Sequence, residues 1–190
     1  MLRLATIILV VVLGGLALVS LLPEREQAQL DSSIRLSGVT LNLYPQADEA
    51  RWRFEANAVD YLPNTRESVL YDIEDGQRLV EGEVDFTLCA DEAVIDNRDN
   101  LRSSQIFVHL VDEKMDMDMR GYGSRQVLID QSTGSFEIPS LNYTGEGLGE
   151  NSADNVRMSF DLAEFSAENP KNQFIDGDSA YLRENLCPKP

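Results

Sequence analysis

Residues 51–58 have the sequence Arg-Trp-Arg-Phe-Glu-Ala-Asn-Ala, in which an apolar side chain occupies every second position. Alternation with a period of two is typical of a β-strand that buries one of its faces. The same period recurs in residues 83–90, 114–119 and 157–162. No stretch within residues 34–190 has a convincing helical period. The sequence therefore predicts an all-β body.

Turn signals separate the predicted strands. They are dipeptides that favour tight turns, namely Pro63-Asn64, Asp75-Gly76, Asp99-Asn100 and Thr133-Gly134. Residues 145–155 are rich in glycine. We expect this stretch to form a loop between the last two strands, because glycine weakens a strand.

A short pattern recurs along the predicted strands, in which a small residue is followed by apolar residues three and five positions later. Its copies start at Ala56, Ala90 and Ser124. A unit of two strands and a turn cannot bury its apolar face alone and must stack on its neighbours. Stacked hairpins would form a folded-over antiparallel sheet or an elongated jelly roll. A chance match is the alternative explanation of the pattern.

An uncharged segment, residues 4–22, precedes this body. At about 1.5 Å per residue, a helix of this length is roughly 28 Å long, close to the thickness of a bilayer core. Arg3 comes before the segment and Glu24 follows it, which places residue 1 in the cytoplasm and the body outside. We expect an uncleaved signal-anchor helix over residues 1–23. A cleaved signal peptide is the alternative, but its apolar core is usually shorter and ends in small residues.

The predicted organisation continues with a linker at residues 24–33, a β-domain at residues 34–168 and a C-terminal tail at residues 169–190. The domain is long enough for one real core. The formal net charge of the chain is −17. Such a surface repels phosphate groups, so we expect no binding to nucleic acid.

The chain has two cysteines, Cys89 and Cys187. Outside the cytoplasm they can form a disulfide bond, which would hold the tail on the body. The alternative is that Cys89 is a small, buried, unpaired residue. Two cysteines and the single histidine, His109, are poor material for a zinc site.

No residue pattern in the sequence points to catalysis or to a bound cofactor. His109 has no Ser or Cys nucleophile in a recognisable motif. Asp112, Asp116 and Asp118 lack the glycine-bearing spacing of an EF-hand calcium loop, and two of them form the outward face of a strand. We therefore expect no enzyme activity, no metal site and no cofactor.

Local sequence resembles the LptC family, whose members join one membrane span to an all-β domain. Residues 41–45 (Leu-Asn-Leu-Tyr-Pro) and 50–56 (Ala-Arg-Trp-Arg-Phe-Glu-Ala), followed by Tyr61, are similar to the opening strands of that family. Residues 90–96 (Ala-Asp-Glu-Ala-Val-Ile-Asp) are similar to a strand that LptC shares with OstA-like bridge domains. The resemblance covers about residues 1–140.

The resemblance implies an OstA-like folded β-jelly roll and a role as a periplasmic bridge in lipopolysaccharide export. The implied partners are an inner-membrane ABC transporter, a periplasmic OstA-like bridge protein and an envelope lipid. It also implies that the membrane helix contacts the transporter. Gly14 and Gly15 offer a point of close helix approach, although they are equally compatible with an ordinary membrane helix.

A lipid carrier of this kind needs a continuous apolar trough, and it requires no catalysis. The candidate lining is the inward face of the strands, with three alternating methionines that adapt to irregular chains. It consists of Trp52, Phe54, Phe86, Leu88, Ile106, Val108, Met115, Met117 and Met119. The alternative is that these side chains pack against one another as a closed core. The protein would then be an envelope-anchored interaction domain that binds a protein partner through its sheet edges.

Overall fold

The computed structural model describes residues 33–44 and 50–172, and these residues belong to one compact unit. This part of the chain contains eleven strands and no helix. The strands are β1 (Ile34–Leu43), β2 (Arg51–Leu62), β3 (Glu67–Val80), β4 (Glu83–Ile95), β5 (Leu101–Ser103), β6 (Gln105–Leu110), β7 (Met115–Arg120), β8 (Val127–Asp130), β9 (Ser135–Gly145), β10 (Leu148–Ser159) and β11 (Phe165–Lys171). The predicted all-β body is confirmed.

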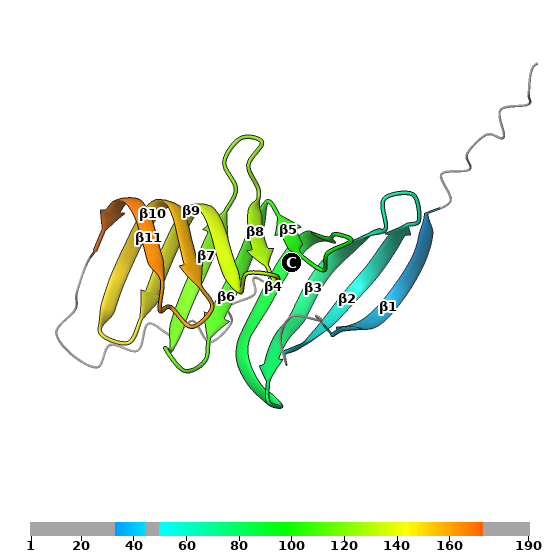
Figure 1. The fold of residues 1–190 in the computed structure, drawn as a ribbon, viewed down its shortest axis with the longest axis horizontal. Helices are drawn as coiled ribbons and strands as arrows, with labels where there is room; N and C mark the ends of the chain where they lie inside the picture. The colour runs from blue at the N-terminus through cyan, green and yellow to red at the C-terminus, as the bar shows by residue number, and fades with distance from the viewer. Residues whose placement is uncertain (1–32, 45–49, 173–190) are drawn as a thin grey trace, which may run out of the picture. The chain divides into compact units, whose positions relative to one another are not determined.

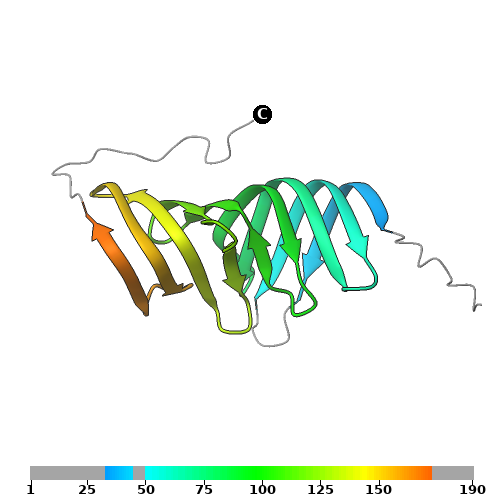
Figure 2. The same ribbon diagram turned by 90° about the horizontal axis from the view of Figure 1, so that it is seen from above.

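The strands form one antiparallel sheet that follows the order of the chain, from β1 at one edge to β11 at the other (Figures 1 and 2). In the middle of the sheet, β5 and β6 both pair with β4, and β7 and β8 both pair with β9. Ser104 alone separates β5 from β6, and residues 121–126 separate β7 from β8. Each of these pairs is therefore one long strand with an interruption, and the sheet is a simple meander.

One apolar core lies between the two halves of this sheet. It includes Trp52 and Phe54 of β2 together with Met158 of β10. The ring of Trp52 also contacts that of Phe160, which follows β10, with the ring centroids 6.4 Å apart. Strands far apart in the meander thus turn their inner faces toward each other, and the sheet is folded over.

The turn predicted at Asp75-Gly76 is wrong, because both residues lie inside β3. The chain reverses instead at Glu81 and Gly82, whose φ angles of 54° and 94° are typical of a tight two-residue hairpin. Gly76 has a different role. A Cβ atom at this position would lie 2.6 Å from Leu88 Cδ1 on the neighbouring strand. The glycine permits a close approach rather than a reversal.

The loop predicted at residues 145–155 is also wrong, because most of this stretch belongs to β10. The turn between β9 and β10 contains only Glu146 and Gly147. The strand pairs with β9 on one side and with β11 on the other, which overrides its weak propensity. Its register shifts between Leu148 and Asn151, so Gly149 marks an irregularity in the ladder.

Several predictions lie outside the described residues. They include the anchor at residues 1–23 with Gly14 and Gly15, almost all of the linker at residues 24–33, and most of the tail. The described residues contain no helix long and apolar enough to cross a membrane. At the other end of the domain, β11 extends to Lys171, three positions beyond the predicted boundary at residue 168.

Candidate functional site

The structure brings all nine predicted trough residues together on the inner face of the sheet. Eight of them are members of one buried cluster, and Met115 packs against that cluster while remaining partly exposed. The eight buried side chains are at most 1% exposed. They are Trp52, Phe54, Phe86, Leu88, Ile106, Val108, Met117 and Met119. The predicted lining is therefore a continuous apolar interior that its own side chains fill.

Aromatic rings form the centre of this interior. Phe86 in β4 lies edge to face with Trp52, with the ring centroids 5.3 Å apart. Phe136 in β9 lies 5.4 Å from Phe86 and 4.8 Å from Phe160. Contacts of this geometry are stabilising beyond the burial of the rings. Phe136 and Phe160, which the sequence analysis did not single out, thus join the two halves of the sheet.

The methionine strand β7 forms another part of the interior, beside an apolar pocket of about 250 Å³. The pocket is lined by Met115, Leu141, Tyr143, Met158, Leu162 and Phe165. The Tyr143 hydroxyl donates a hydrogen bond to Asn172 Oδ1 at 2.8 Å, and burial raises the pKa of this tyrosine. Phe165 is 53% exposed. The interior is thus only partly covered near β11.

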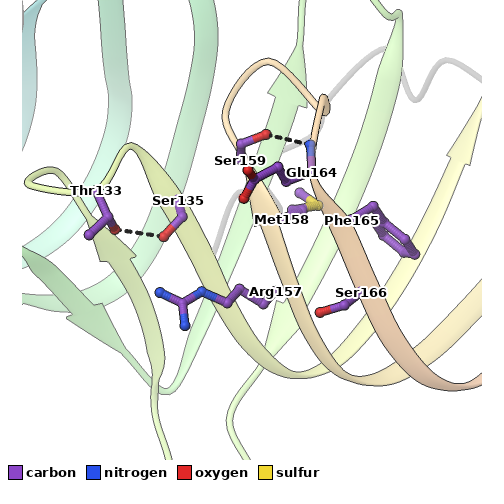
Figure 3. A pocket seen from close by; sticks show the side chains of 8 residues that line it. All are labelled: Thr133, Ser135, Arg157, Met158, Ser159, Glu164, Phe165 and Ser166. Carbon is purple, nitrogen blue, oxygen red and sulfur yellow. Dashed lines mark hydrogen bonds between the residues drawn. The ribbon is translucent and has the colours of Figure 1, made fainter.

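A second pocket, of about 260 Å³, lies beside the β8–β9 and β10–β11 turns (Figure 3). Thr133 and Ser135 share a hydrogen bond of 2.8 Å there, and the Ser159 hydroxyl accepts one from the backbone N–H of Glu164 at 3.0 Å. Neither histidine nor cysteine lines this pocket. The Ser159 hydroxyl also donates a hydrogen bond to Asp161 Oδ1 at 2.6 Å, so the Thr133, Ser135 and Ser159 hydroxyls all bond within the turns.

The largest depression described, of about 520 Å³, lies where the β3–β4 hairpin approaches the turns that follow β8 and β10. Arg78 lines it and is only 8% exposed. Its guanidinium forms an ion pair with Asp85 of the same hairpin and lies 4.7 Å from the centroid of the Phe160 ring. A cation over an aromatic face is attracted by the ring quadrupole, more strongly where water is excluded.

His109 and Asp116 form a polar pair on the outer side of β6 and β7. His109 Nδ1 lies 2.7 Å from Asp116 Oδ1, and the Asp116 side chain is 7% exposed. The two residues are register partners in the sheet. No group of three or more acidic, histidine or cysteine side chains among the described residues could hold a metal ion.

Cys89 in β4 is buried and disulfide-bonded. The other cysteine of the chain, Cys187, lies outside the described residues. The pairing of Cys89 with Cys187 therefore stays a prediction.

Both edge strands of the sheet are open in the described part of the chain, since β1 pairs only with β2 and β11 only with β10. Ile34 and Leu36 at the start of β1 are 52% and 50% exposed. Val39, Leu41 and Leu43 pack partly against the core. An exposed edge offers unpaired backbone groups to another strand, so these edges are potential docking sites.

No known family model matches this sequence, and no curated protein matches it. The described structure itself defines an all-β domain, built from one folded antiparallel sheet with an apolar interior and two open edges.

Proposed function

We propose that this protein is an LptC-like, membrane-anchored bridge that carries an envelope lipid outside the cytoplasm. In this proposal the anchor at residues 1–23 holds the β-domain at the inner membrane. The domain receives lipopolysaccharide or another envelope lipid from an ABC transporter and passes it to an OstA-like periplasmic protein. The transfer requires no chemical step and no cofactor.

The continuous apolar interior carries this proposal. Acyl chains leave water only for an apolar surface, and each buried methylene group contributes about 0.8 kcal/mol. The interior extends from Trp52 in β2 through the methionines of β7 to Met158 in β10. Methionine side chains repack readily around an irregular chain. The sheet is antiparallel and folded over, as an OstA-like jelly roll would require.

The closure of the interior is central to the mechanism of transfer. Trp52, Phe86 and Met117 are at most 1% exposed, so an acyl chain must displace side chains to enter. The half-exposed residues near β1 and β11 suggest that the walls separate at an edge or at one end of the fold. The domain would then be closed when empty and open when it holds lipid.

Photo-crosslinking in intact cells tests the proposal. A small diazirine amino acid at Phe54, Phe86 or Met117 should capture envelope lipid upon irradiation. Arg53 is the matched control, because it neighbours Phe54 but its side chain is 46% exposed. Lipid adducts at Arg53 together with none at the three interior positions would refute the proposal.

A second function is favoured by the tight packing of the interior. The domain would have a permanently closed core and would bind a protein partner through the open edges of β1 and β11. In that case, crosslinkers at Leu36 and Phe165 should capture the same partner protein in cells. The interior positions should remain without lipid adducts under the same conditions.

A further inference from the structure

One aromatic side chain lies between solvent and the interior at the end of the fold where β3 and β4 turn. Among the described residues that line the 520 Å³ depression, Phe160 alone also belongs to the buried core. Its ring contacts those of Trp52, Phe86 and Phe136, with centroids 6.4, 5.6 and 4.8 Å away. Removal of this ring from its place would connect the depression with the aromatic centre of the interior.

Phe160 lies at the end of the β9–β10 ladder, one residue beyond the pair formed by Ser159 and Ser135. It follows the last residue of β10, and its backbone N–H donates to the carbonyl of Gly134 at 2.9 Å. The next residues form a tight turn, in which Leu162 has a φ of 54°. Residues in turns reorganise at lower cost than residues paired on both sides within a sheet. This ring can therefore move while the strands stay paired.

The opposite wall of the sheet holds the ring in place. Arg78 of β3 lies with its guanidinium 4.7 Å from the ring centroid of Phe160, and Asp85 pairs with the same guanidinium. Phe160 is only 7% exposed. The contact between Arg78 and Phe160 thus joins the β3–β4 hairpin to the β10–β11 turn across the entrance.

We propose that Phe160 is a door between the depression and the apolar interior, and that Arg78, held by Asp85, keeps the door closed. A linear aliphatic chain enters from the depression, displaces the ring and reaches Trp52. This inference rests on the proposed function, in which the interior accepts acyl chains.

The rim of the depression also limits the headgroup that can approach. Its charged residues are four acids and one cation, namely Glu83, Asp85, Asp112, Asp161 and Arg78. The arrangement disfavours an anionic headgroup, since like charges repel across a partly desolvated site. The door therefore admits the chain of an uncharged or cationic amphiphile more readily than that of an anionic one.

Trp52 provides a direct readout, because it is the only tryptophan in the chain. The full-length protein, purified in dodecyl maltoside, is transferred into a maltoside whose alkyl chain carries two bromine atoms. Bromine quenches tryptophan fluorescence only on close contact, so the rate of quenching measures arrival of the chain at Trp52. The uncharged headgroup avoids repulsion by the acidic rim.

Three variants test the door. Phe160→Ala should be quenched at least five-fold faster than the parent protein. Arg78→Met keeps every aromatic ring and should be quenched at an intermediate rate. Phe107→Ala is the matched control, because it removes a phenylalanine ring that neither lines the depression nor belongs to the buried core. It should be quenched as slowly as the parent protein, and urea unfolding compares the stability of all four proteins.

The possible results distinguish a failure of the proposed role of Phe160 from a failure of the proposed function. Faster quenching in Phe160→Ala and Arg78→Met than in Phe107→Ala supports the door. Equal quenching of all four proteins overturns the role of Phe160 as a door. The uptake of lipid chains into the interior would still hold in that case. An absence of quenching in every protein overturns the door and also counts against uptake.

Discussion

Trp52 in β2 and Phe160 after β10 meet edge to face, with ring centroids 6.4 Å apart and an interplanar angle of 70°. The contact joins the second strand of the meander to the turn before its last strand. Neither residue can make it until the whole sheet has folded over. The aromatic centre therefore stabilises the folded-over arrangement of the sheet.

Replacement of Trp52 by alanine tests this dependence. The indole is 1% exposed, and its removal leaves a cavity that the surrounding strands can fill only in part. We expect the free energy of unfolding to fall by about 3–5 kcal/mol. Urea unfolding followed by circular dichroism measures the change. Tyr122→Ala, at a residue that is 73% exposed, is the control and should change the stability by less than about 0.5 kcal/mol.

Gly76→Ala should destabilise the domain although it adds only one methyl group. The new Cβ would lie 2.6 Å from Leu88 Cδ1 and 3.2 Å from the Leu88 carbonyl oxygen. Overpacking of this kind costs about 1–3 kcal/mol. The clash with the side chain disappears in the Leu88→Ala background, so the two substitutions should cost less together than the sum of each alone. Strict additivity in urea unfolding would show that Gly76 does not permit this contact.

The sequence predicted the strands in which apolar and polar residues alternate strictly. It predicted the inward face of β2, β4, β6 and β7 for the same reason, since one face of each strand packs against the core. The loop predicted at residues 145–155 was wrong, because pairing on both sides stabilises β10 despite its glycines. Likewise, Gly76 resembles a turn residue in sequence, and only the neighbouring strand shows why a glycine is needed there.

Of two central residues of the candidate site, Phe136 could not be predicted from local patterns and Phe160 was predicted only in part. Phe136 lies in β9, where Ile138 and Leu141 are buried at a spacing of three, so the strand breaks the period of two at Pro139. Phe160 occupies an apolar position of the alternation in residues 157–162, which predicts a strand there. However, β10 ends at Ser159, so Phe160 lies in a turn, where Arg78 on the opposite wall of the sheet covers its ring. Whether the interior is open or filled likewise depends on how the two walls meet, which no single strand determines.

Acid should reduce the stability that Asp130 provides. Burial alone would raise the pKa of this carboxyl group, but hydrogen bonds from Ser132 and Thr133 outweigh burial and lower it. Because its pKa is lower in the folded protein, the carboxylate stabilises the fold at pH values above its pKa in the unfolded chain, which is about 3.9. This contribution is lost as the pH falls through the lower pKa of the folded protein.

The Asp130→Asn variant tests the acid dependence, because it keeps an acceptor oxygen but cannot ionise. It should be less stable than the parent protein at pH 7, by about 1 kcal/mol for charge-assisted hydrogen bonds in a partly exposed turn. The difference should shrink toward zero as the pH falls below about 3.9. Urea unfolding at several pH values measures it, and a difference that stays constant with pH would contradict the prediction.

Reduction of the Cys89–Cys187 bond should destabilise the domain if the predicted pairing is correct. A cross-link between these positions closes a loop of about a hundred residues, and the chain-entropy model assigns it about 4–5 kcal/mol. Cys187→Ser should therefore unfold at a lower urea concentration than the oxidised parent protein and at the same concentration as the reduced one. On non-reducing electrophoresis, the unreduced parent protein should migrate faster than the variant. Complete labelling of both thiols without a reductant would reject the pairing.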